Sequence, residues 1–72
     1  SMVIEHSLNN NVKGQTTSWN HPEKPLAIDI TPTSDNGRCR NFEPIIDAGG
    51  QQKHMRGLAC KESGEWNLKK VY

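Results

Sequence analysis

Three histidines and two cysteines are the side chains of this 72-residue sequence that could ligate a metal ion. His6, His21 and His54 stand far apart, and a long segment separates Cys39 from Cys60. No short ligand pair such as CxxC or HxxxH is present, although structural metal sites usually contain one. Scattered histidines of this kind are typical of surface loops. The sequence therefore predicts no metal site and no other cofactor.

Nucleophilic and acid–base chemistry are also disfavoured by the spacing. A catalytic cysteine needs a base beside it in space, whereas His54 lies three alternations from Cys60 on the same predicted strand. Glycoside hydrolysis needs two carboxyl groups that face one cleft, and the acidic residues are spread over predicted turns and strands. The pattern predicts no catalytic residues and no enzyme.

Aromatic and basic residues form the candidate binding surface instead. Trp19 and Trp66 could line a surface for sugar or peptide, although tryptophans of so small a core are more often packed inside it. Arg40 and Arg56 flank the central hairpin and could attract an anionic component. The alternative is that they are ordinary charged strand residues, which discourage aggregation. The candidate binding surface is therefore Trp19, Arg40, Arg56 and Trp66.

The element that must position these residues is a hairpin centred on Gly49-Gly50. A two-residue loop there places residues whose numbers sum to 99 opposite each other. That register sets Cys39 opposite Cys60, on a non-hydrogen-bonded pair with Cα atoms about 4.5 Å apart. The separation suits a disulfide. Free thiols in a reduced compartment are the alternative, but register and core size both favour the bond.

The remaining elements follow from periodicity. Ile4, Leu8 and Val12 form a helical stripe that ends in asparagines and Gly14, a typical helix end. Pro44 falls inside a predicted strand, so that edge is open or bulged. The predicted helix spans 2–11, and the predicted strands span 15–19, 26–30, 38–46, 53–61 and 65–72.

Together these elements predict an α+β, mostly β fold. A short N-terminal helix accompanies a four- to five-stranded antiparallel meander, stapled by Cys39–Cys60. Apolar groups fall on both faces of the sheet, Phe42 and Ile46 on one and Ile45 and Leu58 on the other. We therefore expect both faces to be covered. Residues 1–72 form one domain, in which Ser1 and Met2 resemble the remnant of a cut expression tag.

Composition narrows the class of partner and the compartment. The net charge is +1 with both signs interspersed, which argues against a nucleic-acid partner. No apolar run approaches the length of a membrane span. A pair of cysteines that can bond favours an oxidising location outside the cytosol. Open strand edges could also drive a homodimer by strand pairing.

Six short runs follow one another between residues 14 and 66: GQTTSW (14–19), TPT (31–33), GRCRNF (37–42), GG (49–50), GLAC (57–60) and GEW (64–66). In order and approximate spacing they resemble the C-terminal domain of the rickettsial 17 kDa surface antigen family. Trp19, Cys39, Cys60 and Trp66 fall on family-like positions. The link between Trp19 and Cys39 differs from the family pattern.

The resemblance implies an exported protein of the periplasm, outer membrane or cell surface, with no catalytic residues to transfer. The expected function is a non-catalytic envelope domain that binds or scaffolds an envelope protein or cell-wall component. Membrane association is expected only through a lipid anchor or glycine zipper, which this sequence lacks. The alternative is a small exported inhibitor of a hydrolase such as lysozyme or a protease. Its candidate loops are 20–25 and 31–37, since a rigid loop loses little entropy on binding.

Overall fold

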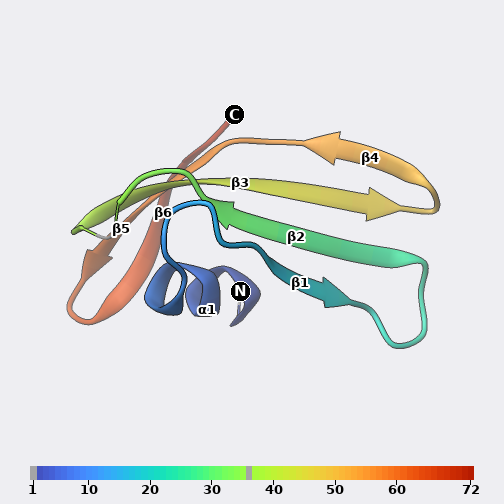
Figure 1. Ribbon diagram of the computed structural model, residues 1–72, viewed down its shortest axis with the longest axis horizontal. Coiled ribbons are helices and arrows are strands. Elements are labelled where there is room, and N and C mark those ends of the chain that lie inside the picture. The colour runs from blue at the N-terminus through green and yellow to red at the C-terminus, as the bar shows by residue number, and fades with distance from the viewer. Residues whose placement is uncertain (1, 36) are drawn as a thin grey trace.

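The protein is a short helix packed on one side of an open antiparallel sheet (Figure 1). The computed structural model describes residues 2–35 and 37–72. It confirms the predicted α+β, mostly β meander with an N-terminal helix, and the sheet has six strands because the returning strand is divided in two. The elements are α1 (Met2–Asn10), β1 (Thr17–Asn20), β2 (Leu26–Pro32), β3 (Cys39–Ala48), β4 (Gln51–His54), β5 (Gly57–Glu62) and β6 (Glu65–Val71).

The central hairpin has the predicted register along its whole length. Ala48 lies opposite Gln51, and every further pair between β3 and β4 or β5 sums to 99, out to Cys39 opposite Cys60. Gly49 and Gly50 have φ of 62° and 84°, the left-handed values that a two-residue hairpin turn requires of both central residues. Turn chemistry therefore sets the register of the sheet's centre.

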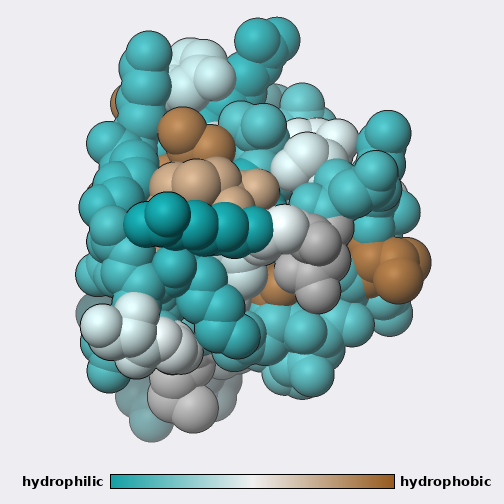
Figure 2. All heavy atoms as spheres, turned by 90° about the vertical axis from the view of Figure 1, so that its left-hand side faces the viewer, coloured by the Kyte–Doolittle hydropathy of each residue, from teal (hydrophilic) through white to brown (hydrophobic). Residues whose placement is uncertain are grey.

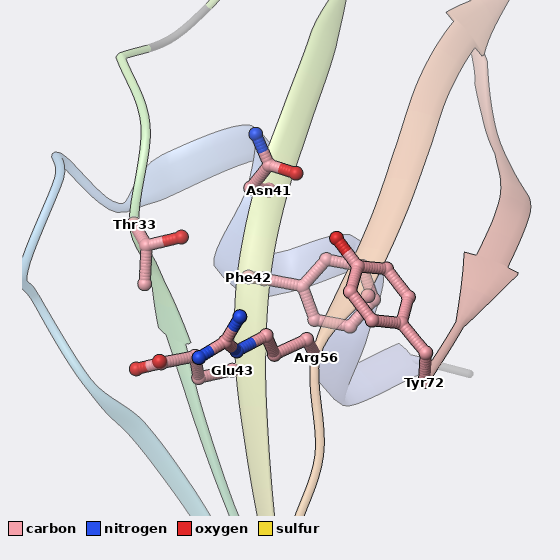
Figure 3. Close-up of a pocket in the computed structure, with 7 residues that line it drawn as sticks. Thr33, Asn41, Phe42, Glu43, Arg56 and Tyr72 are labelled. Atoms are coloured by element: carbon pink, nitrogen blue, oxygen red, sulfur yellow. The ribbon is translucent and has the colours of Figure 1, made fainter.

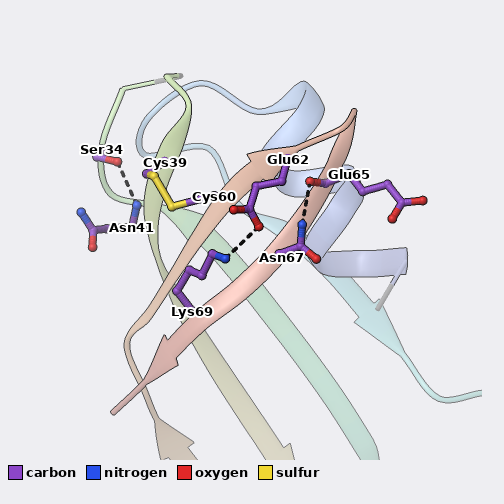
Figure 4. The surroundings of a disulfide bond; sticks show 8 residues. All are labelled: Ser34, Cys39, Asn41, Cys60, Glu62, Glu65, Asn67 and Lys69. Atoms are coloured by element: carbon purple, nitrogen blue, oxygen red, sulfur yellow. Dashed lines mark hydrogen bonds and ion pairs between the residues drawn. A yellow bond between two sulfur atoms is a disulfide. The ribbon is translucent and has the colours of Figure 1, made fainter.

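The disulfide between Cys39 and Cys60 is confirmed, with Cα atoms 4.0 Å apart. Figure 4 shows it joining β3 to β5 beside the turn that leads into β6. It sits on the sheet face turned away from α1, and Cys39 itself is exposed. The bond thus ties the two strands together without forming part of the core.

Pro44 explains why the returning strand divides. The Met55 amide donates to the Pro44 carbonyl at 3.0 Å, but proline has no N–H with which to complete the pair. The ladder with β3 is interrupted at Met55 and resumes at Gly57 in the same register. Arg56, whose backbone groups point away from β3, exchanges hydrogen bonds with Tyr72 at 2.7 and 2.8 Å. The expected irregularity at Pro44 is therefore a missing ladder bond, which divides the returning strand into β4 and β5.

The core lies between α1 and the face that we call the helix face. Its buried members are Leu8, Ile30, Phe42 and Ala59. Gly57 allows this packing because a Cβ there would overlap the Phe42 ring. The expected helical stripe stops short, since Val12 follows the end of α1 and is 69% exposed.

The opposite surface, called here the disulfide face, carries the side chains that alternate with the core residues. Ile45 and Leu58 on it are only partly buried, and the described elements pack on the helix face alone. The expectation that both faces are covered is wrong. The few apolar groups of the disulfide face are diluted by polar neighbours, so the face can remain in contact with water. Among the described residues, no helix has the length and apolar character needed to span a membrane.

Candidate functional site

Arg40 is not part of any surface, contrary to its place among the candidate binding residues. Its side chain is 0% exposed, because alternation along β3 turns it toward α1. Its guanidinium donates to the carbonyls of Leu8 at 2.9 Å, Asn11 at 2.8 Å and Ser34 at 3.1 Å. Leu8 lies in the last turn of α1 and Asn11 directly follows the helix, a place where carbonyls lack partners within the helix. Arg40 therefore anchors the helix rather than a ligand.

Trp66 and Trp19 lie on the helix face, Trp66 on β6 and Trp19 on β1, at opposite edges of the sheet. Trp66 packs against the core, and its indole N–H donates to Asn9 of α1 at 2.8 Å. Trp19 is 37% exposed, and its ring meets His21 edge-on with centroids 5.6 Å apart. The packing alternative thus describes Trp66, while Trp19 stays accessible. The two tryptophans do not converge on one site.

Arg56 projects from the opposite face of the sheet. It is exposed and, together with Glu43 and Tyr72, lines a shallow polar hollow of about 250 Å³ (Figure 3). The Tyr72 ring also receives the Lys70 ammonium, 4.7 Å from its centroid. The four predicted binding residues therefore fall into a buried anchor, two separated tryptophans on one face and an arginine on the other.

A second hollow, called here the apolar groove, opens on the helix face where α1 no longer covers the sheet. It encloses about 180 Å³ and its lining is almost wholly hydrocarbon. Met55, Leu68 and Val71 form one side of it, and Leu68 and Val71 are 55% and 42% exposed. The lining residues are Ile4, Ile28, Ile30, Phe42, Pro44, Ile46, Met55, Leu68 and Val71.

The groove exists because the helix is too short for the strands beneath it. A nine-residue helix is about 13 Å long, whereas the ten residues of β3 extend about 33 Å. Figure 1 shows β2, β3 and β4 running on well past α1. The apolar alternation that buries Ile30 and Phe42 under the helix continues to Ile28 and Ile46 beyond it. Those last residues therefore remain accessible.

Binding of apolar side chains is the chemistry that this groove supports. Small-molecule sites typically enclose about 300–1,000 Å³, so the groove suits one or two side chains of a larger partner. Sequence reasoning missed it, because the alternating residues of β2 and β3 also fit a fully covered core. The groove could have been predicted from the difference in length between the predicted helix and the predicted strands.

Near the disulfide, Lys69 and Glu62 form an ion pair. The Lys69 ammonium lies 2.7 Å from the Glu62 carboxylate (Figure 4), and this hydrogen bond, followed by the charge of Lys69, lowers the pKa of Glu62 from 4.5. Figure 2 shows that hydrophilic groups dominate this end of the molecule, with small separate apolar areas between them. The disulfide end thus offers no continuous apolar surface in that view.

Among the described residues, no three His, Cys, Asp or Glu side chains gather in a way that could hold a metal ion. Both cysteines are in the disulfide. Comparison with models of protein families, with curated proteins and with solved structures finds no match to this chain. The family resemblance therefore stays a prediction.

Proposed function

We propose that this chain is a non-catalytic binding domain of the bacterial cell envelope, acting in the periplasm or at the outer membrane. Its apolar groove receives part of an envelope protein or cell-wall component, and the stapled sheet holds the groove in shape. Trp19, at the far edge of the same face, extends the contact surface. This keeps the expected binding role but moves it from the predicted four-residue surface to the groove.

The observation that carries the proposal is the groove itself. Its nine lining side chains are all apolar, and two of those on β6 are about half exposed. Accessible apolar surface gathered in a hollow marks interaction sites on small proteins. The disulfide is compatible with an oxidising, exported location, and the sequence resemblance to surface antigens supports the same compartment.

Capture experiments with matched variants test this function. Leu68→Asp places a carboxylate in the groove, whereas Asn67→Asp adds the same charge one residue away, on the disulfide face. Immobilised wild-type protein and Asn67→Asp are expected to retain the same component from an envelope extract, identified by mass spectrometry. Leu68→Asp is expected to weaken retention at least about tenfold, since an unpaired charge in an apolar contact costs more than 1.4 kcal/mol.

Equal retention by both variants would contradict the proposal, because binding would then not involve the groove. Retention of no reproducible component by the wild-type protein would contradict it as well. A thermal melt of each variant serves as the folding control. Leu68 is accessible, so its replacement leaves the core intact.

Inhibition of a hydrolase is a second candidate function, favoured by the rigidity of loop 20–25. The His21 imidazole accepts hydrogen bonds from the amides of Glu23 at 3.0 Å and Lys24 at 3.1 Å. Pro25 accepts one from the Gly49 amide at 2.8 Å, which ties the loop to the central hairpin. A loop fixed in this way loses little entropy on binding. The other candidate loop, 31–37, includes Asn36, which lies outside the described residues.

Rate measurements separate the two functions. An inhibitor slows lysozyme or a protease in proportion to its occupancy, and replacing His21 with alanine would relax the loop and weaken that inhibition. A binding domain leaves all of the rates unchanged.

A further inference from the structure

β4 has a free hydrogen-bonding edge whose direction follows from one contact. Because Met55 donates to Pro44, residues 51, 53 and 55 point their backbone groups toward β3. Residues 52, 54 and 56 therefore point theirs the other way. Figure 1 shows β4 at the margin of the sheet, and within the described residues its strand partner is β3.

At one end of this outward-facing edge, the backbone groups of Arg56 already have a partner. Arg56 both donates to and accepts from Tyr72, at 2.7 and 2.8 Å. His54 and Gln52 come next along the same edge, and both are exposed. The pairing of β6 thus leads directly into two residues whose outward N–H and C=O groups have no strand beside them in the part of the chain that is described. A row of such groups at strand spacing is a template for another strand.

The apolar groove adjoins this edge. Met55 and Val71 line the groove and stand at the point where the pairing between Arg56 and Tyr72 ends. Residues opposite each other on neighbouring strands share a face. A residue opposite Met55 would therefore point into the mouth of the groove, and a residue opposite Lys53 would lie beside its exposed ammonium group.

We propose that the domain binds an extended segment of a partner protein by strand addition to β4. The segment runs antiparallel to β4 and bonds the backbone of His54 and Gln52. It places an apolar side chain in the groove beside Met55 and, two residues later, an acidic side chain opposite Lys53. This inference rests on the proposed function and specifies the partner as an apolar and acidic extended peptide. Backbone bonds supply affinity in this mode, and alternate side chains supply specificity.

A second copy of this chain fits the edge less well. Antiparallel pairing of β4 with itself must place side chains of the same face opposite each other, so the pairing centres on Gln52, on Lys53 or on His54. The His54 register would set Gln52 of the partner copy opposite Arg56, whose outward groups already bond Tyr72, which leaves the first two. The first register places Gly49 of the partner copy opposite Met55, and the second places Gln51 there. Neither residue fills an apolar groove, and the second register also sets the two Lys53 ammonium groups opposite each other, which is unfavourable.

Amide hydrogen exchange followed by NMR tests the proposal with the synthetic peptide Ile-Thr-Glu-Thr-Val-amide, which has no N-terminal cap because Tyr72 already fills the position beside Arg56. In the free protein, the amides of Gln52 and His54 are expected to exchange fast and those of Gln51 and Lys53 slowly. Peptide at about nine times its dissociation constant is expected to slow Gln52 and His54 about tenfold, because exchange then occurs only from the free fraction. The same peptide with lysine in place of isoleucine and glutamate is expected to leave them fast.

Two variants, one of the protein and one of the peptide, each remove a backbone N–H that the proposed pairing needs. His54→Pro removes an outward N–H, which an edge strand tolerates, and is expected to abolish the slowing at Gln52, whereas His54→Ala keeps it. On the wild-type protein, a peptide N-methylated at the residue facing His54 is expected not to bind, which repeats the test without any change in the fold.

Equal binding by His54→Pro and His54→Ala, or groove shifts without slower exchange at Gln52, would overturn strand addition. So would slowing that appears without peptide as the protein concentration rises, since a second copy would then occupy the edge. Different results contradict the two proposals. If His54→Pro still captures the envelope component, strand addition alone is contradicted. If the peptide protects the amides but no envelope component is captured, only the envelope function is contradicted.

Discussion

Replacing Arg40 with methionine tests how the helix is held on the sheet. The guanidinium is fully buried and bonds the carbonyls of Leu8 and Asn11 at the end of α1. Methionine fills a similar volume without any hydrogen-bond donor, so the variant removes the bonds and leaves no large cavity. The helix would then keep its apolar contacts but lose the polar anchor of its C-terminal end.

The expected loss follows from those two buried bonds. A hydrogen bond to a charged group contributes about 1.5–3 kcal/mol, so two of them amount to about 3–6 kcal/mol. Relief of the buried charge offsets part of this, and we expect a net loss of about 3 kcal/mol. A domain of 72 residues has about 4–10 kcal/mol of total stability. Arg40→Met should therefore remain folded in water, but with a much smaller free energy of unfolding.

Urea unfolding followed by tryptophan fluorescence measures this loss. With a slope of about 1 kcal/mol/M for so small a protein, the midpoint of Arg40→Met should fall by about 3 M. Arg56→Met is the matched control, because Arg56 is exposed, and its midpoint should change by less than about 0.5 M. A free energy of unfolding for Arg40→Met within about 1 kcal/mol of the wild-type value would contradict the role of Arg40 as a structural anchor.

Three further predictions concern the rest of the scaffold. Replacing Cys39 and Cys60 with serine should cost about 3 kcal/mol, since the bond closes a segment with a sequence separation of 21; unfolding with and without reductant checks this. Lys69→Met should raise the pKa of Glu62 toward 4.5, seen by NMR titration of its carboxyl carbon. Because the folded pKa is the lowered one, the stabilising effect of that pair exists above pH 4.5 and is lost as the pH falls through the folded pKa. Gly57→Ala should destabilise by about 1–3 kcal/mol through overlap with the aromatic ring beside it.

Each of these has an outcome that would contradict it. Gly37→Ala is the control for Gly57, because the nearest atom to an added Cβ is 3.9 Å away, and equal effects of the two would remove the packing argument. An unchanged Glu62 titration in Lys69→Met would mean that the ion pair does not persist in solution. Reduction without loss of stability would show that the staple is dispensable.

The central hairpin was predictable because local rules decide it. Gly49 and Gly50 fix the turn, the turn fixes the register, and the register brings Cys39 opposite Cys60. Pro44 indicated an irregularity in its strand because proline lacks a backbone N–H, and the same cause is seen in the structure. These features need no knowledge of which elements pack together.

The site was less predictable because it depends on tertiary coverage. Arg40 carries a charge, and charged residues are rarely fully buried, so a surface role was the natural reading of the sequence. Only the position of the end of α1 makes burial favourable, by supplying carbonyl partners. The exposure of Leu68 likewise depends on where the helix stops along the sheet, which no alternation pattern specifies.

Photo-crosslinking in cells tests whether the apolar groove contacts a partner in the envelope. A photoreactive residue at position 68 faces the groove, and the same residue at position 67 faces the other side of β6. If the groove binds the partner, position 68 gives one reproducible envelope adduct and position 67 gives none. Identical adducts from both positions, or none from position 68 while the folded and disulfide-bonded protein is present in the envelope, would contradict binding through the groove.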